Sequence, residues 1–368
     1  GHLAPGFERV ADVLARALDA GEEIGAGFAA VQNGAILVNI WGGHADRART
    51  QPWARNTIAP VYSATKPISA LVLGRLIDSR DVRLETPVAH YWPPFAAAGK
   101  ETVTIAQALS HQAGLAGFPA PIDPELWLDP PALSAQLAAL APLWPPGTAS
   151  GYHPLTWGYL IETLAERIAG RTVAALLEEE ICAPRDIDFR IGLPESEDAR
   201  TAEMRRPTRL PDLGARSEIK RAAFLAKWSA PDRADPRWRR LPIPSANGYG
   251  TALALAQLYS IYAQRGLYDG EKVFSETAWR ALTARRIEGE DLVLPFRLDW
   301  RGGILGNNLG LFGPNPHTLG HYGWGGACGV ADADAGLAIG YVTNQQSHHL
   351  MGDPRPRALI SALYACLS

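Results

Sequence analysis

The chain has 368 residues, of which 47% are hydrophobic, and its 35 basic and 38 acidic side chains leave a formal net charge of -3. This length and apolar content suit a globular protein of two lobes or one large domain. The charges are interspersed, so the sequence predicts no cationic surface for nucleic acid or for an anionic membrane. No apolar run approaches the roughly 20 residues that span a bilayer, and the N-terminus lacks a signal-peptide pattern.

The three cysteines, Cys182, Cys328 and Cys366, are odd in number and far apart. Their spacing predicts neither a disulfide framework nor a metal site, and it fits a reducing compartment. We therefore expect a cytoplasmic protein that needs no metal and no cofactor. The sequence leaves open a targeting segment removed ahead of Gly1, and it leaves the oligomeric state open as well.

The N-terminal segment predicts one helix and one hairpin. Apolar side chains recur at helical spacing over residues 7–20. Two apolar runs, 27–32 and 35–41, then flank Asn33-Gly34, a pair that is typical of a tight hairpin turn.

In the rest of the chain the pattern of apolar residues is first mainly helical and then typical of strands. Residues 64 to about 290 have a mainly helical pattern with connections rich in proline and glycine, and they contain no strong strand signal. After 290 the strand signal returns: the runs 329–331 and 337–343 flank a turn, and a last helix is predicted over about 355–367.

Strands at both ends of the chain predict an α/β (α+β) fold. We expect one antiparallel sheet, built from the N- and C-terminal segments and flanked by helices, with an all-helical lobe inserted. This divides the chain into a sheet domain, residues 1–63 plus 290–368, and a mainly helical lobe, residues 64–289. Clefts usually form between lobes, so we expect the active site at the seam.

The motif Ser63-Ala64-Thr65-Lys66 presents a hydroxyl and an amine three residues apart. Apolar residues follow at helical spacing and Pro67 falls in the first turn, so the motif is predicted to open a helix. Lys66 then lies on the face of Ser63, and the positive end of the helix dipole favours negative charge there. Ser63 is thus a candidate nucleophile, although a capping serine followed by a solvated lysine is the alternative.

Two further segments supply candidate partners. A turn-rich loop presents Tyr152 just before an amphipathic helix, and a tyrosine beside a lysine can act as a base if its pKa is lowered. The alternative for Tyr152 is a packed ring with a hydrogen-bonded hydroxyl. The glycine-dense stretch 320–329 could bring a backbone N–H close to a substrate as an oxyanion donor, or it could be a tightly packed strand.

These three stations, in this order, resemble the serine β-lactamase and penicillin-binding-protein superfamily, most closely the family VIII carboxylesterases related to class C β-lactamases. Ser63-Ala64-Thr65-Lys66 matches S-x-x-K, Tyr152-His153-Pro154 stands at Y-x-N, and His321-Tyr322-Gly323 stands at K-T-G or H-x-G. Supporting stretches also match, including the segments 109–115 and 247–252. The resemblance covers nearly the whole chain.

The resemblance implies acyl transfer through a covalent serine intermediate. Ser63 would attack a carbonyl, and Lys66 and Tyr152 would handle its proton, without fixing which of the two is the base. By match to the family, the N–H groups of Ser63 and Trp324, the residue after Gly323, would form the oxyanion hole.

Two departures from the family pattern bear on the substrate. His321 replaces a lysine that helps β-lactamases bind a carboxylate, and at neutral pH we expect it to be only partly charged. Pro154 replaces an asparagine whose amide contacts β-lactam and peptide substrates, and proline has no polar side-chain group. Simple esters need these contacts less.

We therefore expect a serine hydrolase that acts as a carboxylesterase on small, fairly apolar esters, with Ser63, Lys66, Tyr152 and His321 as catalytic residues. Gly323, Trp324 and Pro154 would bind substrate, together with Ser63. The alternatives are a weak β-lactamase, a D-amino-acid amidase or peptidase, an acyltransferase, and a slow penicillin-binding or scaffold protein. No Gly-x-Ser-x-Gly, His-Glu-x-x-His or phosphate-loop motif occurs in the sequence.

Overall fold

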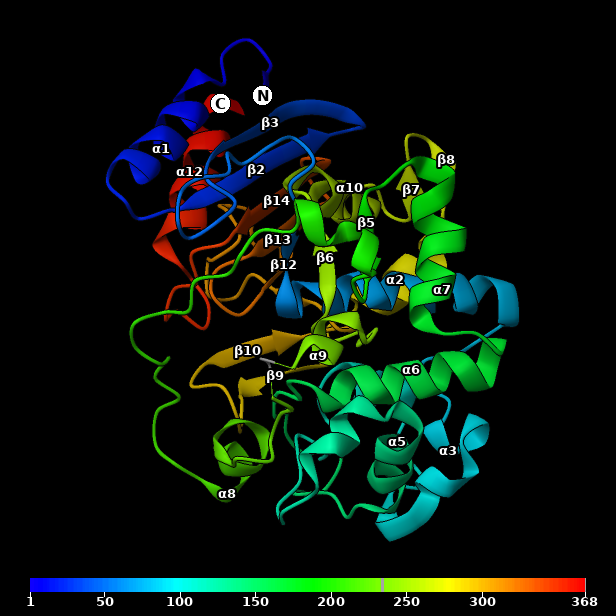
Figure 1. Ribbon diagram of the computed structural model, residues 1–368. Helices are drawn as coiled ribbons and strands as arrows, with labels where there is room; N and C mark the ends of the chain where they lie inside the picture. The colour runs from blue at the N-terminus through cyan, green and yellow to red at the C-terminus, as the bar shows by residue number, and fades with distance from the viewer. Residues whose placement is uncertain (233–234, 368) are drawn as a thin grey trace.

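The computed structural model of the protein describes residues 1–232 and 235–367. A nine-stranded antiparallel sheet forms its larger layer (Figure 1). In spatial order its strands are β1 (His2–Leu3), β3 (Ala35–Gly43), β2 (Gly25–Gln32), β14 (Leu337–Thr343), β13 (Cys328–Asp332), β12 (Leu319–Tyr322), β11 (Leu305–Gly306), β10 (Arg297–Trp300) and β9 (Ile287–Glu290). β14 pairs with β2 over all seven of its residues, so the predicted sheet from the two ends of the chain is confirmed.

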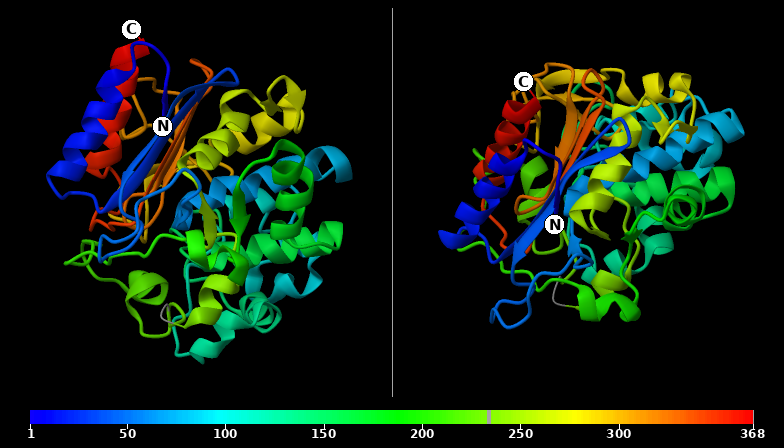
Figure 2. Two further views of the ribbon diagram at one scale, coloured as in Figure 1. Left: turned by 45° about the horizontal axis from the view of Figure 1, so that its top comes forward. Right: turned by 90° about the horizontal axis from the view of Figure 1, so that it is seen from above.

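The terminal helices cover one face of this sheet. Helix α1 (Glu8–Asp19) buries Val10 and Leu14, and it packs beside α12 (Pro354–Leu367), as Figure 2 shows. Helix α10 (Ala252–Ala263) packs against β2, β13 and β14. The predictions of a helix near each terminus are therefore confirmed to within one or two residues, the usual uncertainty of helix ends.

The turn between β2 and β3 has the backbone that its sequence predicts. Asn33 has a φ of 48° and Gly34 a φ of 86°, and two successive positive φ values define the tight turn that matches the strand twist. Asparagine and glycine adopt this conformation at the lowest steric cost. The predicted hairpin is therefore confirmed.

Helices and single turns dominate the middle of the chain, and several of them gather in the lower part of Figure 1. They are the 3₁₀ turn η1 (Tyr62–Ala64), α2 (Thr65–Arg80), α3 (Val88–Tyr91), η2 (Pro93–Gly99), α4 (Ile105–Leu109), η3 (Pro124–Leu128), α5 (Pro130–Ala139), α6 (Thr156–Ala169), α7 (Val173–Leu177), η4 (Glu178–Cys182), η5 (Ala183–Arg185), η6 (Glu195–Arg200), α8 (Glu218–Lys220), η7 (Arg221–Leu225), α9 (Pro236–Arg240) and α11 (Glu276–Thr283).

The expectation that residues 64–290 hold no strand is wrong in detail. Strand β6 (Gly248–Gly250) lies between β4 (Ala59–Pro60) and β5 (Phe189–Ile191) in a small sheet and pairs with both, and β7 (Leu267–Tyr268) pairs with β8 (Glu271–Lys272). Strand β9 also lies before residue 290 and joins the large sheet. All of these strands have two to four residues, too few for an alternating pattern to emerge in the sequence.

We retain the division into residues 1–63 plus 290–368 and residues 64–289 as a proposal. Helix α10 belongs to the second range by sequence, yet it packs on the strands of the first. A helix of the second range therefore packs directly on the large sheet of the first.

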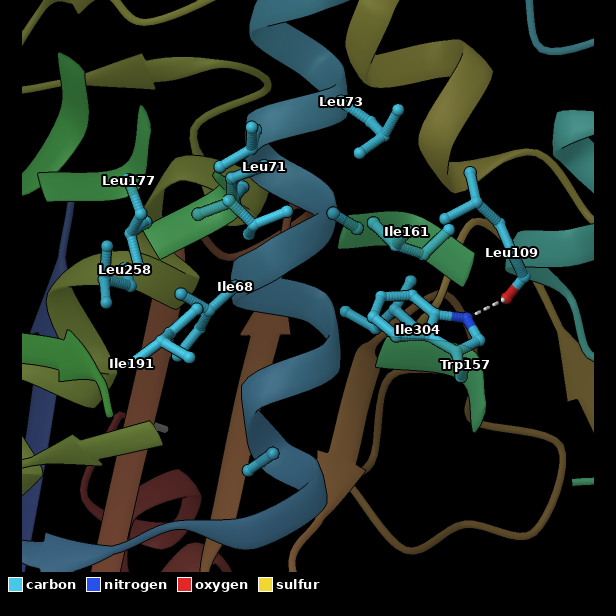
Figure 3. Close-up of a cluster of buried hydrophobic side chains, with 14 of the residues drawn as sticks. Ile68, Leu71, Leu73, Leu109, Trp157, Ile161, Leu177, Ile191, Leu258 and Ile304 are labelled. Carbon is cyan, nitrogen blue, oxygen red and sulfur yellow. Dashed lines mark hydrogen bonds between the residues drawn. The ribbon is translucent and has the colours of Figure 1, made fainter. Parts of the chain in front are cut away.

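Helix α2 runs through a cluster of buried hydrophobic side chains (Figure 3). Eleven of its 16 residues are buried, all of them between Thr65 and Leu76, so this part of the helix has no polar stripe, while the last turn is exposed. Ile68 and Leu71 point into a cluster of aliphatic side chains that includes Leu258 of α10, while Trp157 of α6 packs on another side and donates its indole N–H to the Leu109 carbonyl at 3.0 Å (Figure 3).

Two tyrosines of α10 hold the start of α2. The hydroxyl of Tyr259 donates to the Ala64 carbonyl at 3.0 Å, and that of Tyr262 donates to the Pro67 carbonyl at 2.7 Å. The Tyr259 ring reaches this position across Gly329 of β13, where a Cβ atom would lie 2.3 Å from the ring. Gly329 is therefore required for packing between the sheet and α10.

We predict that Gly329→Ala destabilises the protein by about 1–3 kcal/mol, the usual cost of overpacking a core. The measurement is the free energy of unfolding in urea. Gly289→Ala in β9 is the matched control, because a Cβ there meets nothing within 4 Å and should change stability by no more than about 0.5 kcal/mol. Equal effects of the two substitutions would contradict this account of Gly329.

Candidate active site

Ser63 lies in the turn η1, immediately before α2. The residue before it, Tyr62, has a φ of 46°, a left-handed conformation that is costly for a residue with a side chain. This bend leads the chain from β4 into η1 and α2. Lys66, in the first turn of α2, is buried, and its Nζ lies 3.2 Å from the Ser63 Oγ.

The Lys66 amine has four close oxygen neighbours. Besides Ser63 Oγ, they are Tyr152 Oη at 2.9 Å, the Pro154 carbonyl at 2.9 Å and the Ser245 carbonyl at 3.1 Å. Within residues 1–232 and 235–367 no carboxylate forms an ion pair with this amine. Burial lowers the pKa of Lys66 well below its usual value, which favours the neutral amine.

The two carbonyl neighbours determine how a neutral Lys66 amine must be oriented. A carbonyl oxygen only accepts, so Pro154 and Ser245 each take one amine hydrogen. A neutral amine has two hydrogens, and both are then engaged. Its single lone pair is left to accept one hydroxyl hydrogen, and the Ser63 hydroxyl lies within reach of it, as a proton acceptor for Ser63 needs.

Tyr152 lies in the loop before α6, and its ring is buried. The Trp300 ring stacks on it with centroids 5.6 Å apart and planes 6° apart, and the His111 ring lies 4.9 Å away. Burial raises the pKa of Tyr152 well above its usual value, outweighing its hydrogen bond with Ser63. Tyr152 could act as a base only if its pKa were lowered, and this environment raises it instead.

His321 lies in β12 at the edge of the same cluster. Its Nδ1 is 2.7 Å from the Tyr322 carbonyl and donates to it in the neutral ring. Burial, with a smaller contribution from the nearby Lys66, lowers the pKa of His321 to about 3. The expectation that His321 is partly charged at neutral pH is therefore wrong, because a buried imidazole without an acidic partner stays neutral.

In the glycine-dense stretch 320–329, a glycine is needed where the backbone comes close to another segment. A Cβ atom on Gly323 would lie 2.1 Å from the Val61 carbonyl, so only glycine lets the end of β12 approach the segment before Ser63. This approach brings Trp324 to the wall of the cavity that contains Ser63. Pro154 lines the same cavity with its ring, while its carbonyl binds Lys66.

The cavity at Ser63 has a volume of about 60 Å³ and a largely apolar wall. Its lining combines the predicted residues Ser63, Tyr152, Pro154, His321 and Trp324 with Tyr62, Leu155, Phe224, Ala246, Leu294, Trp300, Leu305, Tyr322, Leu350 and Met351. A wider groove of about 780 Å³ adjoins it, and the rings of Tyr62, Phe224 and Trp324 line both spaces.

Sequence reasoning missed three residues of this site: Phe224, Asp291 and Trp300. Phe224 belongs to η7, and its ring lies 6.3 Å from Tyr152 and 6.1 Å from Trp324. Asp291 follows β9, and its Oδ1 accepts the Tyr152 backbone N–H at 2.9 Å. None of the three belongs to a recognisable motif, and each lies more than 70 residues from Tyr152 in sequence, so no local signal points to them.

Within the described residues no group of three histidine, cysteine or carboxylate side chains could hold a metal ion. Their helices also include none with the length and apolar composition needed to cross a bilayer.

Comparisons with known proteins agree with this geometry. The family model described as Beta-lactamase matches residues 10–363. The chain is 33% identical over 347 residues to the esterase/beta-lactamase LipL of Mycobacterium tuberculosis, an alignment that covers 88% of this chain and 78% of that protein.

Two crystal structures match the whole chain. A novel penicillin-binding protein homolog from Caulobacter crescentus has 44% sequence identity and a TM-score of 0.97, over 100% of this chain and 99% of that one. A family VIII carboxylesterase has 38% identity and a TM-score of 0.93, with the same coverage of both chains. At these identities the similarity extends beyond the shared fold.

Proposed function

The chain belongs to the beta-lactamase family of serine hydrolases, and within this family we propose that it is a carboxylesterase that cleaves small, fairly apolar esters through an acyl-Ser63 intermediate. The observation that carries the proposal is the cluster of Ser63, Lys66 and Tyr152 beside an apolar cavity that offers no permanently charged side chain. The names of two relatives, an esterase/beta-lactamase and a family VIII carboxylesterase, support ester hydrolysis.

Lys66 is the base of the acylation step in this proposal. Its neutral amine takes the proton of the Ser63 hydroxyl while Oγ bonds to the carbonyl carbon of the ester. The carbonyl oxygen becomes an oxyanion, which the N–H groups of Ser63 and Trp324 stabilise. Two observations support Lys66 over Tyr152 as the base: the lowered pKa of the amine, and the two carbonyls that orient its lone pair.

Tyr152 acts as a proton carrier rather than a base. Its raised pKa keeps the phenol protonated, and its hydroxyl lies 2.9 Å from Lys66 Nζ. When the bond between the acyl carbon and the alcohol oxygen breaks, the phenol gives its proton to the leaving oxygen and regains one from Lys66. Water then attacks the acyl carbon and gives a proton to the neutral Lys66 amine. The bond between the acyl carbon and Ser63 Oγ breaks, Ser63 Oγ takes up that proton, and the carboxylic acid leaves.

The neutral His321 and the ring of Pro154 favour esters over β-lactams. A carboxylate of a β-lactam substrate finds no permanent cation at His321. The amide group of such a substrate finds no polar side chain at Pro154. An ester with an apolar arm loses little from either change, because the cavity wall beside Ser63 is mostly leucine, methionine and aromatic side chains.

We predict that Ser63→Ala lowers kcat by at least about three orders of magnitude on a p-nitrophenyl ester, since residual binding and electrostatics retain some rate above water. Intact-mass measurement should detect an acyl adduct on Ser63 in the unmodified protein. Ser150→Ala is the control, because Ser150 is a buried serine in the loop that carries Tyr152, and it should leave kcat unchanged. An adduct on another serine, or a stable adduct without turnover, would contradict the carboxylesterase proposal.

The pH dependence of kcat/KM distinguishes the two candidate bases. The neutral Lys66 amine is active, so the rate should rise with pH through the lowered pKa of Lys66 and reach a plateau well below pH 10.5, the ordinary value for lysine. Because the pKa of Tyr152 is raised, the plateau should extend to at least about pH 10. An ascending limb centred near 10, as a tyrosinate base with an ordinary pKa would give, would contradict this assignment.

Substrate choice is the third test. Each missing polar contact is worth about 1–3 kcal/mol, so the changes at His321 and Pro154 should together disfavour cephalosporins by about two to four orders of magnitude in kcat/KM relative to a short-chain ester. The double variant His321→Lys with Pro154→Asn should raise β-lactam turnover relative to ester turnover. Efficient cephalosporin hydrolysis with feeble ester cleavage by the unmodified protein would refute the proposal.

A further inference from the structure

A single buried carboxylate holds the segment that carries Tyr152. Asp291 Oδ1 accepts three backbone N–H groups: those of Tyr152 at 2.9 Å, Val293 at 3.0 Å and Leu294 at 2.9 Å. Its Oδ2 accepts the indole N–H of Trp300 at 3.0 Å. Only 7% of the residue is exposed, so these four bonds replace most of its hydration.

The four donors are all neutral. Across residues 1–232 and 235–367 no lysine or arginine forms an ion pair with Asp291, although buried carboxylates are usually paired with a cation. Hydrogen bonds to a carboxylate are about twice as strong as bonds between neutral groups. Asp291 therefore makes strong hydrogen bonds to two backbone segments and to the indole ring of Trp300.

Both attachments act on the same tyrosine. The bond to the Tyr152 N–H fixes its backbone, and the bond to Trp300 fixes the indole that stacks on the Tyr152 ring at 5.6 Å and 6°. A phenol held at its backbone and stacked along one face has little freedom to tilt its hydroxyl away from its neighbours. Lys66 Nζ lies 2.9 Å from that hydroxyl.

We propose that Asp291 is a positioning residue, which keeps the Tyr152 hydroxyl within proton-transfer distance of Lys66 and Ser63 through these two attachments. The proposal rests on the proposed role of Tyr152 as a proton carrier. Misplacement of a reacting group by a fraction of an ångström to 1 Å costs rate more than it costs substrate binding, so the effect of losing Asp291 belongs mainly in kcat.

The test is Asp291→Asn. The amide oxygen can still accept the three backbone N–H groups, but the new NH₂ group faces the indole N–H of Trp300, where two donors cannot bond. We expect kcat for a p-nitrophenyl ester to fall by about 10- to 100-fold, with KM changed less than about threefold. Asp332→Asn is the matched control, because Asp332 is also a buried carboxylate that accepts two backbone N–H groups and two side-chain donors, from Asn315 and Tyr364, away from the site.

A second variant separates positioning from loss of stability. Trp300→Phe removes the conflicting N–H and keeps an aromatic ring over Tyr152, so the double variant Asp291→Asn with Trp300→Phe should recover part of the lost kcat. A double variant that loses the product of the two single effects would overturn the proposal, and so would an equal loss of kcat in Asp332→Asn.

Tyr152→Phe, measured beside these variants, distinguishes failure of the positioning proposal from failure of the proposed function. If Tyr152→Phe lowers kcat strongly while Asp291→Asn retains the unmodified rate, positioning by Asp291 is refuted and the proton carrier stands. If Tyr152→Phe retains the unmodified rate, the proton carrier itself is refuted and the proposal for Asp291 falls with it.

Discussion

The burial of one amine is the constraint on which the site depends. Lys66 Nζ is removed from water and surrounded by two carbonyl oxygens and two hydroxyls, with no anion to compensate its charge among the described neighbours. Loss of hydration disfavours the ammonium form, and the two carbonyls take the hydrogens of the amine that remains. The same burial that makes this lysine costly to fold therefore leaves it with a lone pair directed at a serine hydroxyl.

The surrounding architecture keeps that environment dry. The first three turns of α2 are buried, and two tyrosines of α10 bond to the carbonyls of Ala64 and Pro67 at its start. Helix α10 in turn packs on the strands that join the two ends of the chain, with Gly329 leaving room for Tyr259. The position of Ser63 and Lys66 thus depends on hydrogen bonds between segments 195 residues apart, and through α10 on the packing of the large sheet.

A second consequence of burial concerns the substrate. His321 is neutral and its Nδ1 is bonded to a backbone carbonyl, while Pro154 contributes only its carbonyl to Lys66. His321 and Pro154 replace polar residues of the family, and they therefore bring no charge to the cavity, whose remaining wall is apolar. This agrees with relatives named as esterases, and it gives a physical reason why the proposed substrates are esters with a small apolar arm.

The sequence by itself determined the features that depend on local chemistry. Asn33-Gly34 predicted its hairpin because few residue pairs adopt two positive φ values, and Ser63, Lys66, Tyr152 and His321 were found because they stand in short motifs in a fixed order. Only the tertiary structure decided the short strands β5 to β9, the protonation states of Tyr152 and His321, and the contribution of Phe224, Asp291 and Trp300. Strands of a few residues carry no periodic signal, a pKa depends on which groups surround a side chain after folding, and Asp291 meets Tyr152 across 139 residues of chain.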